Sequence, residues 1–538
     1  MGMAASLSRV IPSQARVLCF ASAAMATGSG DVPPVVPPAV PPVDAGATAW
    51  VLACTGFVLI MSLPGLAIFY GGFVRSKNVL SVLAQCFAIT AITTVLWMFI
   101  GYSLTFTDGG VMNPFIGGLS RVFMAGVTGE TMLTRPGISI PLAADAVYQG
   151  SYAFLAPAIL VGSVVERMRT KAVLWFAGLF LLFVYVPIAH MLWCEGGWMM
   201  QWGILDWAGG LVVGTTAGVA GLVACIMVGP RVGYPEKTFR PHNTTLIVIG
   251  TGMLWTGWIG FEGGTGLRAD GVASMAVITT HTAAAFGALG WTGIEWLLHH
   301  GRPSIIGFCA GAVAGLAAIT PAAGYVGVMA AAAIGILGAV ICYWMAVWVK
   351  SKLGWDETLD AFGVHATGGM VGTILVGVLG APELGGPRSD TFDVKEQLGK
   401  QTVGVLFTVA YTVAVSYLLL KTIGYFAGGL RVDPEVERRG LDVAELNDGA
   451  YMFGMHNWDP EAAFVADAAT RAAWVADRIA REQVAAGDAG PRFRTLGRTS
   501  SLRRALMSEG SMSPGLPAET GSLQVPHLDV GAAAPVVA

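Results

Sequence analysis

The stretch "DAFGVHATGGMVGTILVGVLG", residues 360–380, decides the fold class of this chain. It is a run of small and apolar residues, close to the ~20 residues that an α-helix needs to cross a bilayer core. Asp360 opens the run, and His365 lies about one and a half helical turns further in. Because an ionisable group inside a membrane helix is costly, it marks a pathway by default. The stretch therefore predicts a transmembrane helix with a functional histidine; a histidine that only packs between helices is the alternative interpretation.

The composition of the whole chain supports a membrane protein with many spans. Of its 538 residues, 54% are hydrophobic and only 12% are charged, and the mean hydropathy is +0.64. Soluble domains usually have about a quarter of their residues charged. The net charge of −3 gives no sign of a nucleic-acid partner. The cysteines have no paired spacing, so neither a disulfide framework nor a metal or other cofactor is expected.

Apolar stretches of spanning length follow one another from residue 47. The predicted all-α polytopic fold has eleven spans, at 48–70, 80–105, 147–165, 172–193, 206–228, 244–264, 272–297, 304–320, 324–349, 360–381 and 402–428. The loops after odd-numbered spans carry more Lys and Arg in less total length, which is typical of cytoplasmic loops. We therefore expect the N-terminus outside and the C-terminus in the cytoplasm.

The two ends of the chain differ from its middle. Residues 1–46 hold two arginines, a short apolar run and a Pro-rich linker, and are interpreted as a signal or transit segment or as a disordered tail. We expect the transmembrane domain at 47–428. Residues 429–538 predict a cytoplasmic tail whose distal part is disordered. Whether a cytoplasmic regulator binds there is left open.

A short internal repeat indicates two halves of opposite orientation. "GLAIFYGG" at 65–72 and "GWIGFEGG" at 257–264 share one pattern, five spans apart. Asp206 and Asp360 each open a Gly-rich span, again five spans apart. An odd number of spans between repeats inverts the second half, and such inverted repeats place the substrate path at their interface. The sequence thus predicts an inverted repeat of five and five spans plus one further helix.

Several motifs together resemble the ammonium transporter family (Amt/Mep, related to the Rhesus proteins). They are "AWVLACTGFVLIMSLPGLAIFYGGFVRSKNVLSVL" (49–83), "YVPIAHMLW" (185–193), "DWAGGLVVGTTAGVAGLV" (206–223), "TPAAGYVG" (320–327) and "DAFGVHATGGMVGTILVG" (360–377). The resemblance covers roughly residues 47–455 in unbroken order. It implies eleven spans, a homotrimer in the plasma membrane with one pore per subunit, and conduction of ammonium or ammonia. No enzymatic activity is implied.

The resemblance also assigns residues to the outer part of the pore. A recruitment site for ammonium falls on Trp193, Thr265 and Tyr152, and an aromatic gate on Tyr152 and Phe261. Aromatic faces attract a cation that sheds its water, by ~0.5–2 kcal/mol per ring. Asp206 matches a buried acid of the family, expected to cap its helix and to add negative potential near the outer site.

The middle of the pore departs from the family pattern. His365 matches the second of two facing pore histidines, and Asp360 an acid at the inner end of the same helix. The first histidine is expected eight residues after Asp206, where this chain has Gly214. We expect a wider, wetter mid-pore with one imidazole, and Thr215 or water as a relay. An ammonium sensor on the same scaffold and a less selective cation or gas channel remain as alternatives.

Further ionisable residues have two interpretations each. Glu262, where relatives usually have Asn, either replaces the charge of the missing histidine or faces a neighbouring helix. Asp145 and Glu195, near the outer mouth, are interpreted either as charges that raise the local cation concentration or as solvated loop charges. His190 and His281 are expected to bond between helices.

Overall fold

The computed structural model describes residues 42–237, 239–386 and 392–451. The predictions for residues 1–41 and 452–538 fall outside the described residues. Within the described ranges the chain is helical, with three isolated β-bridges and no strand. This all-helical architecture confirms the predicted fold class.

The helices follow one another with short loops or single π-helical turns between them. The α-helices are α1 (Ala45–Ile60), α2 (Leu66–Phe73), α3 (Val79–Leu96), α4 (Tyr102–Phe106), α5 (Leu142–Val161), α6 (Thr170–Phe180), α7 (Val186–Trp193), α8 (Trp198–Trp202), α9 (Thr216–Val228), α10 (Thr244–Gly263), α11 (Gly271–Leu298), α12 (Ile305–Ile319), α13 (Val328–Tyr343), α14 (Lys350–Leu353), α15 (Thr367–Leu379), α16 (Val394–Phe426) and α17 (Pro434–Arg439). The π-helical turns are η1 (Met61–Gly65), η3 (Trp97–Gly101), η6 (Leu181–Tyr185), η7 (Gly210–Thr215), η8 (Trp344–Val349), η9 (Ala361–Ala366) and η11 (Asp442–Leu446). Short 3₁₀ turns are η2 (Ser76–Asn78), η4 (Gly110–Met112), η5 (Val122–Met124) and η10 (Pro382–Leu384).

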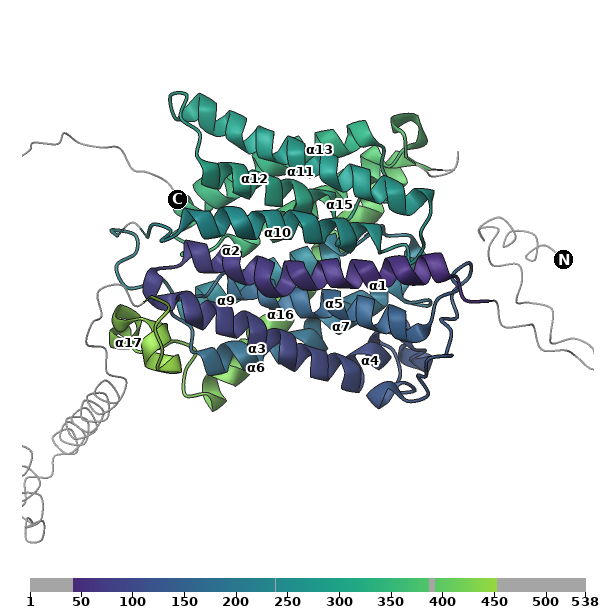
Figure 1. Ribbon diagram of the computed structural model, residues 1–538, viewed down its shortest axis with the longest axis horizontal. Helices are drawn as coiled ribbons and strands as arrows, with labels where there is room; N and C mark the ends of the chain where they lie inside the picture. The colour runs from purple at the N-terminus through teal and green to yellow at the C-terminus, as the bar shows by residue number, and fades with distance from the viewer. Residues whose placement is uncertain (1–41, 238, 387–391, 452–538) are drawn as a thin grey trace, which may run out of the picture. The chain divides into compact units, whose positions relative to one another are not determined.

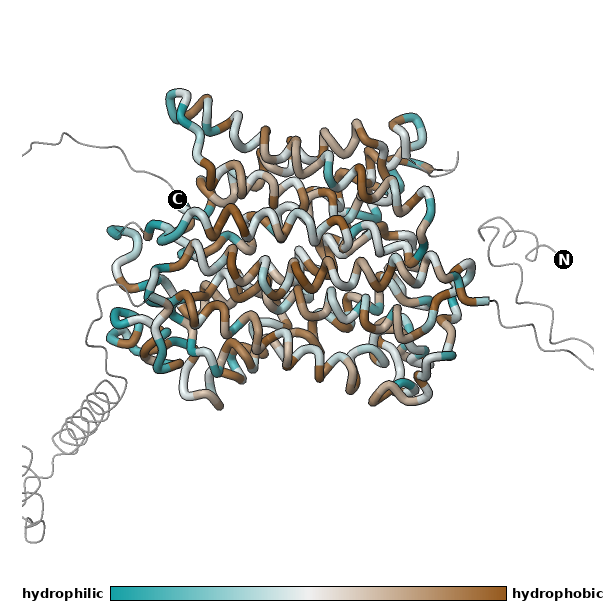
Figure 2. Tube along the Cα trace, viewed as in Figure 1, coloured by the Kyte–Doolittle hydropathy of each residue, from teal (hydrophilic) through white to brown (hydrophobic). Residues whose placement is uncertain are grey.

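Helices occupy the eleven stretches that were predicted to span. Among the described residues, nine continuous helices are long and apolar enough to cross a membrane. The two other stretches hold α12, a shorter apolar helix, and α5, which has 20 residues. The helices run alongside one another (Figure 1), and hydrophilic residues gather in the loops at the two ends of the bundle (Figure 2). The chain is a multi-pass membrane protein.

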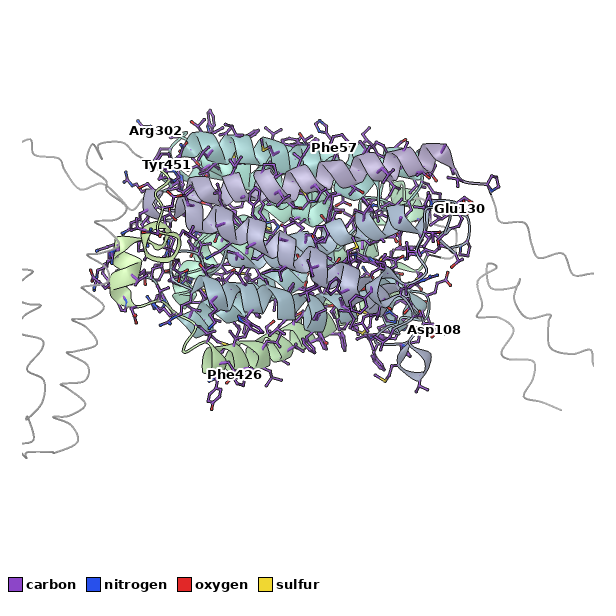
Figure 3. All side chains as sticks on the ribbon, turned by 60° about the horizontal axis from the view of Figure 1, so that its bottom comes forward. Phe57, Asp108, Glu130, Arg302, Phe426 and Tyr451 are labelled. Carbon is purple, nitrogen blue, oxygen red and sulfur yellow. The ribbon has the colours of Figure 1, made fainter. Side chains whose placement is uncertain are left out.

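The loops sort to the two ends as the topology predicts. Asp108 and Glu130, from a loop expected outside, lie at one end, while Arg302 and Tyr451, expected in the cytoplasm, lie at the other (Figure 3). This arrangement follows from helices that cross the bundle in alternating directions.

Each motif of the internal repeat packs against the helical segment that carries the other motif. A Cβ atom on Gly72 would lie 2.8 Å from the backbone nitrogen of Ile247, and one on Gly257 would lie 2.3 Å from the Cβ of Met61. Helix α10 therefore touches η1 and α2 almost backbone to backbone. Small residues permit this close approach in membranes, where packing drives helix association.

A buried carboxylate completes the start of each pore helix. Asp206 accepts four backbone N–H groups of η7: Oδ1 those of Gly209 and Gly210 (3.0 and 2.6 Å), and Oδ2 those of Leu211 and Val212 (2.9 and 3.1 Å). The expected capping role of Asp206 is thus visible in its contacts. These bonds satisfy N–H groups that a helix start leaves without partners.

The counterpart of Asp206 in the second half is Glu357. The carboxylate of Glu357 accepts the backbone N–H groups of Phe362 and Gly363 in η9, and the hydroxyl of Ser163 at 2.8 Å. Asp206 and Glu357 each precede the first residue of their π-turn by four positions. Asp360 instead has a left-handed backbone (φ 54°) and an ion pair with Lys350. The pairing of Asp206 with Asp360 was wrong, because residue type alone does not reveal this offset.

The first part of the predicted tail belongs to the helical body. Asp442 accepts the backbone N–H groups of Leu80 (3.0 Å) and Ser81 (2.7 Å) at the start of α3. Glu437 accepts the N–H of Val232 at 2.6 Å and pairs with Arg431 at 2.8 Å. Residues 430–451 thereby tie together loops that lie far apart in the sequence.

Candidate functional site

The three predicted recruitment residues lie close together in the helix bundle. Trp193 ends α7, Thr265 follows α10, and Tyr152 lies within α5. The Tyr152 and Thr265 hydroxyls are 2.8 Å apart, and the Tyr152 ring meets Trp193 edge-on at 5.8 Å. Trp193 and Thr265 are half-buried, whereas Tyr152 is buried. An aromatic edge, an aromatic face and a hydroxyl thus converge on one partly open position.

The capping acid also fixes the recruitment tryptophan. The Trp193 indole N–H donates to the backbone carbonyl of Asp206 at 3.0 Å. The turn that Asp206 organises therefore sets the orientation of Trp193.

A stacked pair of rings closes the path below this position. The rings of Tyr152 and Phe261 are 4.1 Å apart at an angle of 25°, and both side chains are buried. Tyr148, one turn before Tyr152, supports the pair: its hydroxyl lies 2.7 Å from that of Tyr152 and donates to the Phe261 carbonyl at 2.7 Å. The sequence reasoning missed Tyr148, although its i−4 spacing from Tyr152 places both rings on one helix face.

A narrow apolar cavity lies beyond the stacked rings. Its volume is ≈ 10 Å³, close to the minimum for one water molecule. Phe261 bounds the cavity together with His365, while Leu155, Ile159 and Val213 contribute apolar wall. This short passage has room for a small neutral molecule and little for a hydrated ion.

His365 stands between this cavity and a larger one. Its buried imidazole lies in η9 and stacks almost parallel to the Trp258 ring, at 6.2 Å and 8°. The same residue lines a second cavity of ≈ 560 Å³, whose wall includes Arg240 and His299. His365 is therefore part of the wall of both cavities.

Gly214 does not widen the middle of the path, contrary to expectation. A Cβ atom on Gly214 would lie 2.9 Å from the backbone carbonyl oxygen of His365. A Cβ on Gly369 would similarly lie 2.3 Å from the carbonyl oxygen of Gly210. The backbones of the two pore helices lie close together here, and the cavity that Gly214 lines has a volume of only ≈ 10 Å³, so the predicted wide, wet mid-pore was wrong.

Thr215 lies away from both cavities. Its buried hydroxyl donates to the Gly210 carbonyl at 2.8 Å within its own helix. The relay role predicted for Thr215 is not supported by this position. Thr320, which the sequence reasoning passed over, lines the narrow cavity and accepts the Trp258 indole N–H at 3.0 Å.

The comparisons with known proteins agree with this geometry. Residues 49–451 match the model of the Ammonium Transporter Family. The chain belongs to the ammonium transporter family. Ammonium transporter Amt1 of Archaeoglobus fulgidus is 40% identical over 406 residues, which cover 76% of this chain and 99% of that protein. The ammonium transporter of Aquifex aeolicus is 39% identical over 414 residues, 76% of this chain and 94% of that protein.

Solved structures of this transporter family share the fold. The crystal structure of Saccharomyces cerevisiae Mep2 has a TM-score of 0.67 at 32% identity, covering 73% of this chain and 88% of that chain. A structure titled Sensor Amt Protein has a TM-score of 0.68 at 26% identity, covering 74% of this chain and 98% of that one.

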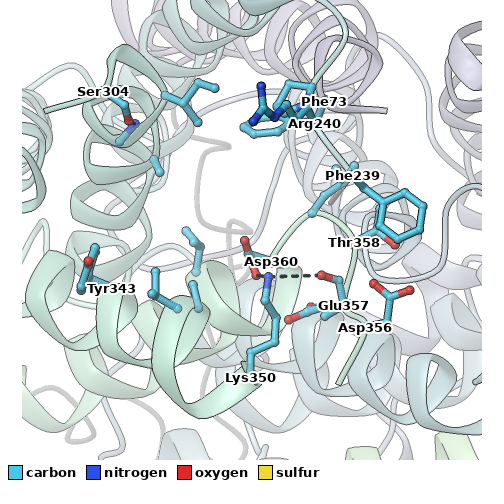
Figure 4. A pocket seen from close by; sticks show the side chains of 18 of the residues that line it. Phe73, Phe239, Arg240, Ser304, Tyr343, Lys350, Asp356, Glu357, Thr358 and Asp360 are labelled. Carbon is cyan, nitrogen blue, oxygen red and sulfur yellow. Dashed lines mark hydrogen bonds and ion pairs between the residues drawn. The ribbon is translucent and has the colours of Figure 1, made fainter. Parts of the chain in front are cut away.

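The cavity of ≈ 560 Å³ forms a vestibule in this transporter (Figure 4). Charged side chains at its wall are held in pairs: Lys350 with Asp360 at 2.5 Å, and Arg231 with Glu166 at 2.8 Å and Asp356 at 2.7 Å. The ring of Phe239 lies 4.0 Å from the Arg231 guanidinium. The vestibule is therefore wide and has charged side chains in its wall, whereas the path around Tyr152 and Phe261 is narrow and aromatic.

The ion pairs lower the pKa values of two acids in the wall of the vestibule, Glu166 and Asp356. Burial alone would raise the pKa of Glu166, but the guanidinium groups of Arg231 and Arg75 outweigh it and hold that pKa below its usual value. Burial would also raise the pKa of Asp356, but the Arg231 guanidinium outweighs it and lowers that pKa. Both acids therefore stay ionised at neutral pH and keep the loops in place.

The remaining ionisable candidates have mixed outcomes. Asp145 is fully buried and accepts the Tyr102 hydroxyl at 2.9 Å, so its interpretation as a solvated charge was wrong. Glu195 is exposed. His190 is buried between the carbonyls of Thr105 (2.8 Å) and Asn113 (2.6 Å), so it bonds between segments. His281 is exposed, and its ring lies 5.5 Å from that of Trp255.

Proposed function

We propose that this chain carries ammonium inward by removing a proton at the Tyr152–Phe261 gate and passing ammonia through the narrow cavity. The observation that carries the proposal is the alignment of the recruitment residues, the stacked gate, the apolar cavity and His365 along one path. Trp193, Tyr152 and Thr265 would hold ammonium as it loses water, through ring faces and a hydroxyl.

The size and polarity of the cavity favour the neutral form of the substrate. Transfer of a bare ion into a low-dielectric interior costs of order 20 kcal/mol on an ideal Born estimate. A cavity of ≈ 10 Å³ cannot enclose the hydration shell that would offset this cost. Ammonia, which carries no net charge, avoids the penalty.

His365 serves as the polar station at the inner end of the apolar passage. A neutral imidazole has one nitrogen that donates and one that accepts a hydrogen bond, so it can bind ammonia without adding a charge. Ammonia that passes His365 enters the wide vestibule and regains a proton there. Asp206 acts on this route through Trp193, whose indole it positions.

We also propose a homotrimer in the plasma membrane with the N-terminus outside and the C-terminus in the cytoplasm. The excess of basic residues in the loops at the Arg302 end supports this orientation. Large apolar side chains are exposed along several helices, among them Leu289 of α11, Met329 of α13 and Leu418 of α16. Such faces suit lipid or a neighbouring subunit.

A sensor on the same scaffold is the second candidate. The missing first histidine at Gly214 favours it, and one structural neighbour is titled a sensor. The close packing at Gly214 and the curated relatives named as transporters favour transport.

Expression in a yeast strain that lacks ammonium uptake tests the proposal. We expect the wild-type chain to restore growth on low ammonium, His365→Ala to abolish it, and Trp193→Leu to raise the ammonium concentration needed. Tight binding without growth or methylammonium uptake would favour the sensor. A potassium current that competes with ammonium would favour the unselective channel.

A further inference from the structure

Glu262 is a buried acid beside the gate that the proposed transport path does not use. It follows Phe261 in α10 and is fully buried. Neither carboxylate oxygen has a hydrogen-bond partner among residues 42–237, 239–386 and 392–451. Only its backbone is engaged, with the carbonyl accepting the Trp207 indole N–H at 3.0 Å.

An unpartnered carboxylate in this position is expensive to ionise. A buried charge without partners costs several kcal/mol even after the protein relaxes. Asp206 adds to the cost, because its own charge acts on Glu262. The group therefore either holds a proton or has a cation close by.

The surroundings of Glu262 lead toward His365. Thr320 and Trp258 lie close to the carboxylate, and neither completes a hydrogen bond to it. Trp258 is one turn earlier on the same helix, so both side chains share a face. Trp258 and Thr320 also line the narrow cavity, and the Trp258 ring stacks on His365. A continuous set of neighbours thus joins the acid beside the gate to the imidazole.

Asp206 is less suited than Glu262 to receive a proton. Its two oxygens accept four backbone N–H groups, which stabilise the charged form and occupy its lone pairs. The lone pairs of Glu262 face no such donors. Of these two neighbouring acids, Glu262 is the one whose charge nothing compensates.

We propose that Glu262 accepts the proton that ammonium gives up at the gate. An N–H bond of ammonium breaks and an O–H bond forms on the carboxylate, so NH4⁺ and Glu–COO⁻ become NH3 and Glu–COOH. The inference rests on the proposed transport function. The approaching cation lowers the cost of the ionised carboxylate, and the transfer leaves two neutral groups in a region that disfavours charge.

The proton then continues on a route beside the ammonia path. The narrow cavity touches Thr320, Trp258 and His365 and has the size of about one water molecule. One water or the Thr320 hydroxyl suffices to pass the proton from Glu262 toward the imidazole. Glu262 then ionises again as the next ammonium approaches, and one positive charge crosses for each ammonia.

Paired measurements of current and uptake test this assignment. The wild-type chain and its variants are expressed in oocytes, and ammonium-evoked current and labelled methylammonium uptake are recorded under voltage clamp. We expect Glu262→Gln to lower both by about tenfold or more, since loss of a proton acceptor costs 10²–10⁴-fold in related chemistry. Glu262→Asp, which keeps the carboxylate, should recover part of both. Asp145→Asn, which changes a buried acid outside both cavities, should leave both unchanged.

A spectroscopic measurement on the wild-type chain does not depend on any variant folding. Infrared difference spectra of proteoliposomes should show a change in the carbonyl band of a protonated carboxylic acid when ammonium is added. Absence of this change, or wild-type current and uptake in Glu262→Gln, would overturn the role of Glu262. Absence of uptake by the wild-type chain would instead overturn the transport proposal on which it rests.

Discussion

The two pore helices of this transporter begin alike and differ four residues into their π-turns. In the first half Asp206 caps η7, and Gly214 follows; in the second Glu357 caps η9, and His365 follows at the same offset. One half contributes backbone and the other an imidazole. The two halves of the inverted repeat therefore share the same helix start, but the equivalent positions differ. Gly214 permits close contact between the helices, whereas His365 places an imidazole at the cavity wall.

The loops before the two helices are also held by different forces. Leu205, before η7, exchanges two hydrogen bonds with the Gln401 amide of α16, at 2.8 and 2.7 Å. Asp356, before η9, is held by the Arg231 guanidinium in an ion pair. Uncharged hydrogen bonds hold the loop before η7, and an ion pair holds the loop before η9. Acid should therefore destabilise the loop before η9 first.

Replacing either capping acid, Asp206 or Glu357, should have the largest effect on stability. Asp206→Ala leaves four buried N–H groups without partners, each costing about 1–3 kcal/mol, so we expect a loss of at least about 4 kcal/mol. Glu357→Ala frees two N–H groups and one hydroxyl, so the loss should be smaller. Unfolding of the purified variants in detergent measures both. Equal losses would show that the two acids do not differ as their contacts indicate.

Removing the imidazole tests the chemical side of the comparison. His365→Ala takes away the polar group between the two cavities, and methylammonium uptake should fall more than tenfold, or ~1.4 kcal/mol. Stability should change less than in Asp206→Ala. His365→Gln keeps a donor and an acceptor, and partial uptake by it would support hydrogen bonding as the role.

Adding one carbon to Gly214 tests the packing side. The new Cβ of Gly214→Ala would meet the His365 carbonyl oxygen at 2.9 Å, so we expect a cost of ~1–3 kcal/mol and reduced uptake. Gly252→Ala on α10 has no neighbour within 4 Å and is the matched control. If Gly214→Ala were as stable as this control, the close helix contact would not exist in the folded transporter.

The acid sensitivity of the inner loops is the smallest effect. The lowered pKa of Glu166 means that its ion pairs stabilise the fold above the ordinary Glu pKa of about 4.3, and that this contribution is lost as pH falls through the lowered value. The melting temperature of Glu166→Gln should therefore lie below that of wild type at pH 7, and the gap should shrink toward pH 3. Gln401→Ala, which removes the uncharged hydrogen bonds to Leu205, is the matched comparison. Its melting temperature should lie below that of wild type by an amount that does not vary with pH.

Much of the fold could be predicted because lipid imposes simple rules. Spanning helices need long apolar runs, and the eleven runs are visible in the sequence. The aromatic residues of the outer path were found through motifs that resemble a family. Their convergence, with Tyr152 stacked on Phe261, could not be read from spacing, because they come from different helices.

The errors share one physical cause, which is that the surroundings of a residue come from distant parts of the chain. Gly214 was expected to leave a wide space, but the two pore helices lie close together there. Asp360 was expected to be the counterpart of Asp206, but it has a left-handed φ and pairs with Lys350. Glu357 instead accepts the N–H groups at the helix start. Asp145 was expected to be solvated because it is charged, yet it is buried and accepts a hydrogen bond from the Tyr102 hydroxyl. Such outcomes depend on partners that a single sequence does not place.

The contact between Asp442 and the start of α3 has a consequence for how the chain is made. Leu80 and Ser81 enter the membrane early in synthesis, while the carboxylate that satisfies their N–H groups emerges some 360 residues later. The hydrogen bonds at the start of α3 therefore stay incomplete until the segment after α16 has been made. A chain whose synthesis stalls before residue 442 would contain the membrane helices but lack the Asp442 hydrogen bonds to Leu80 and Ser81.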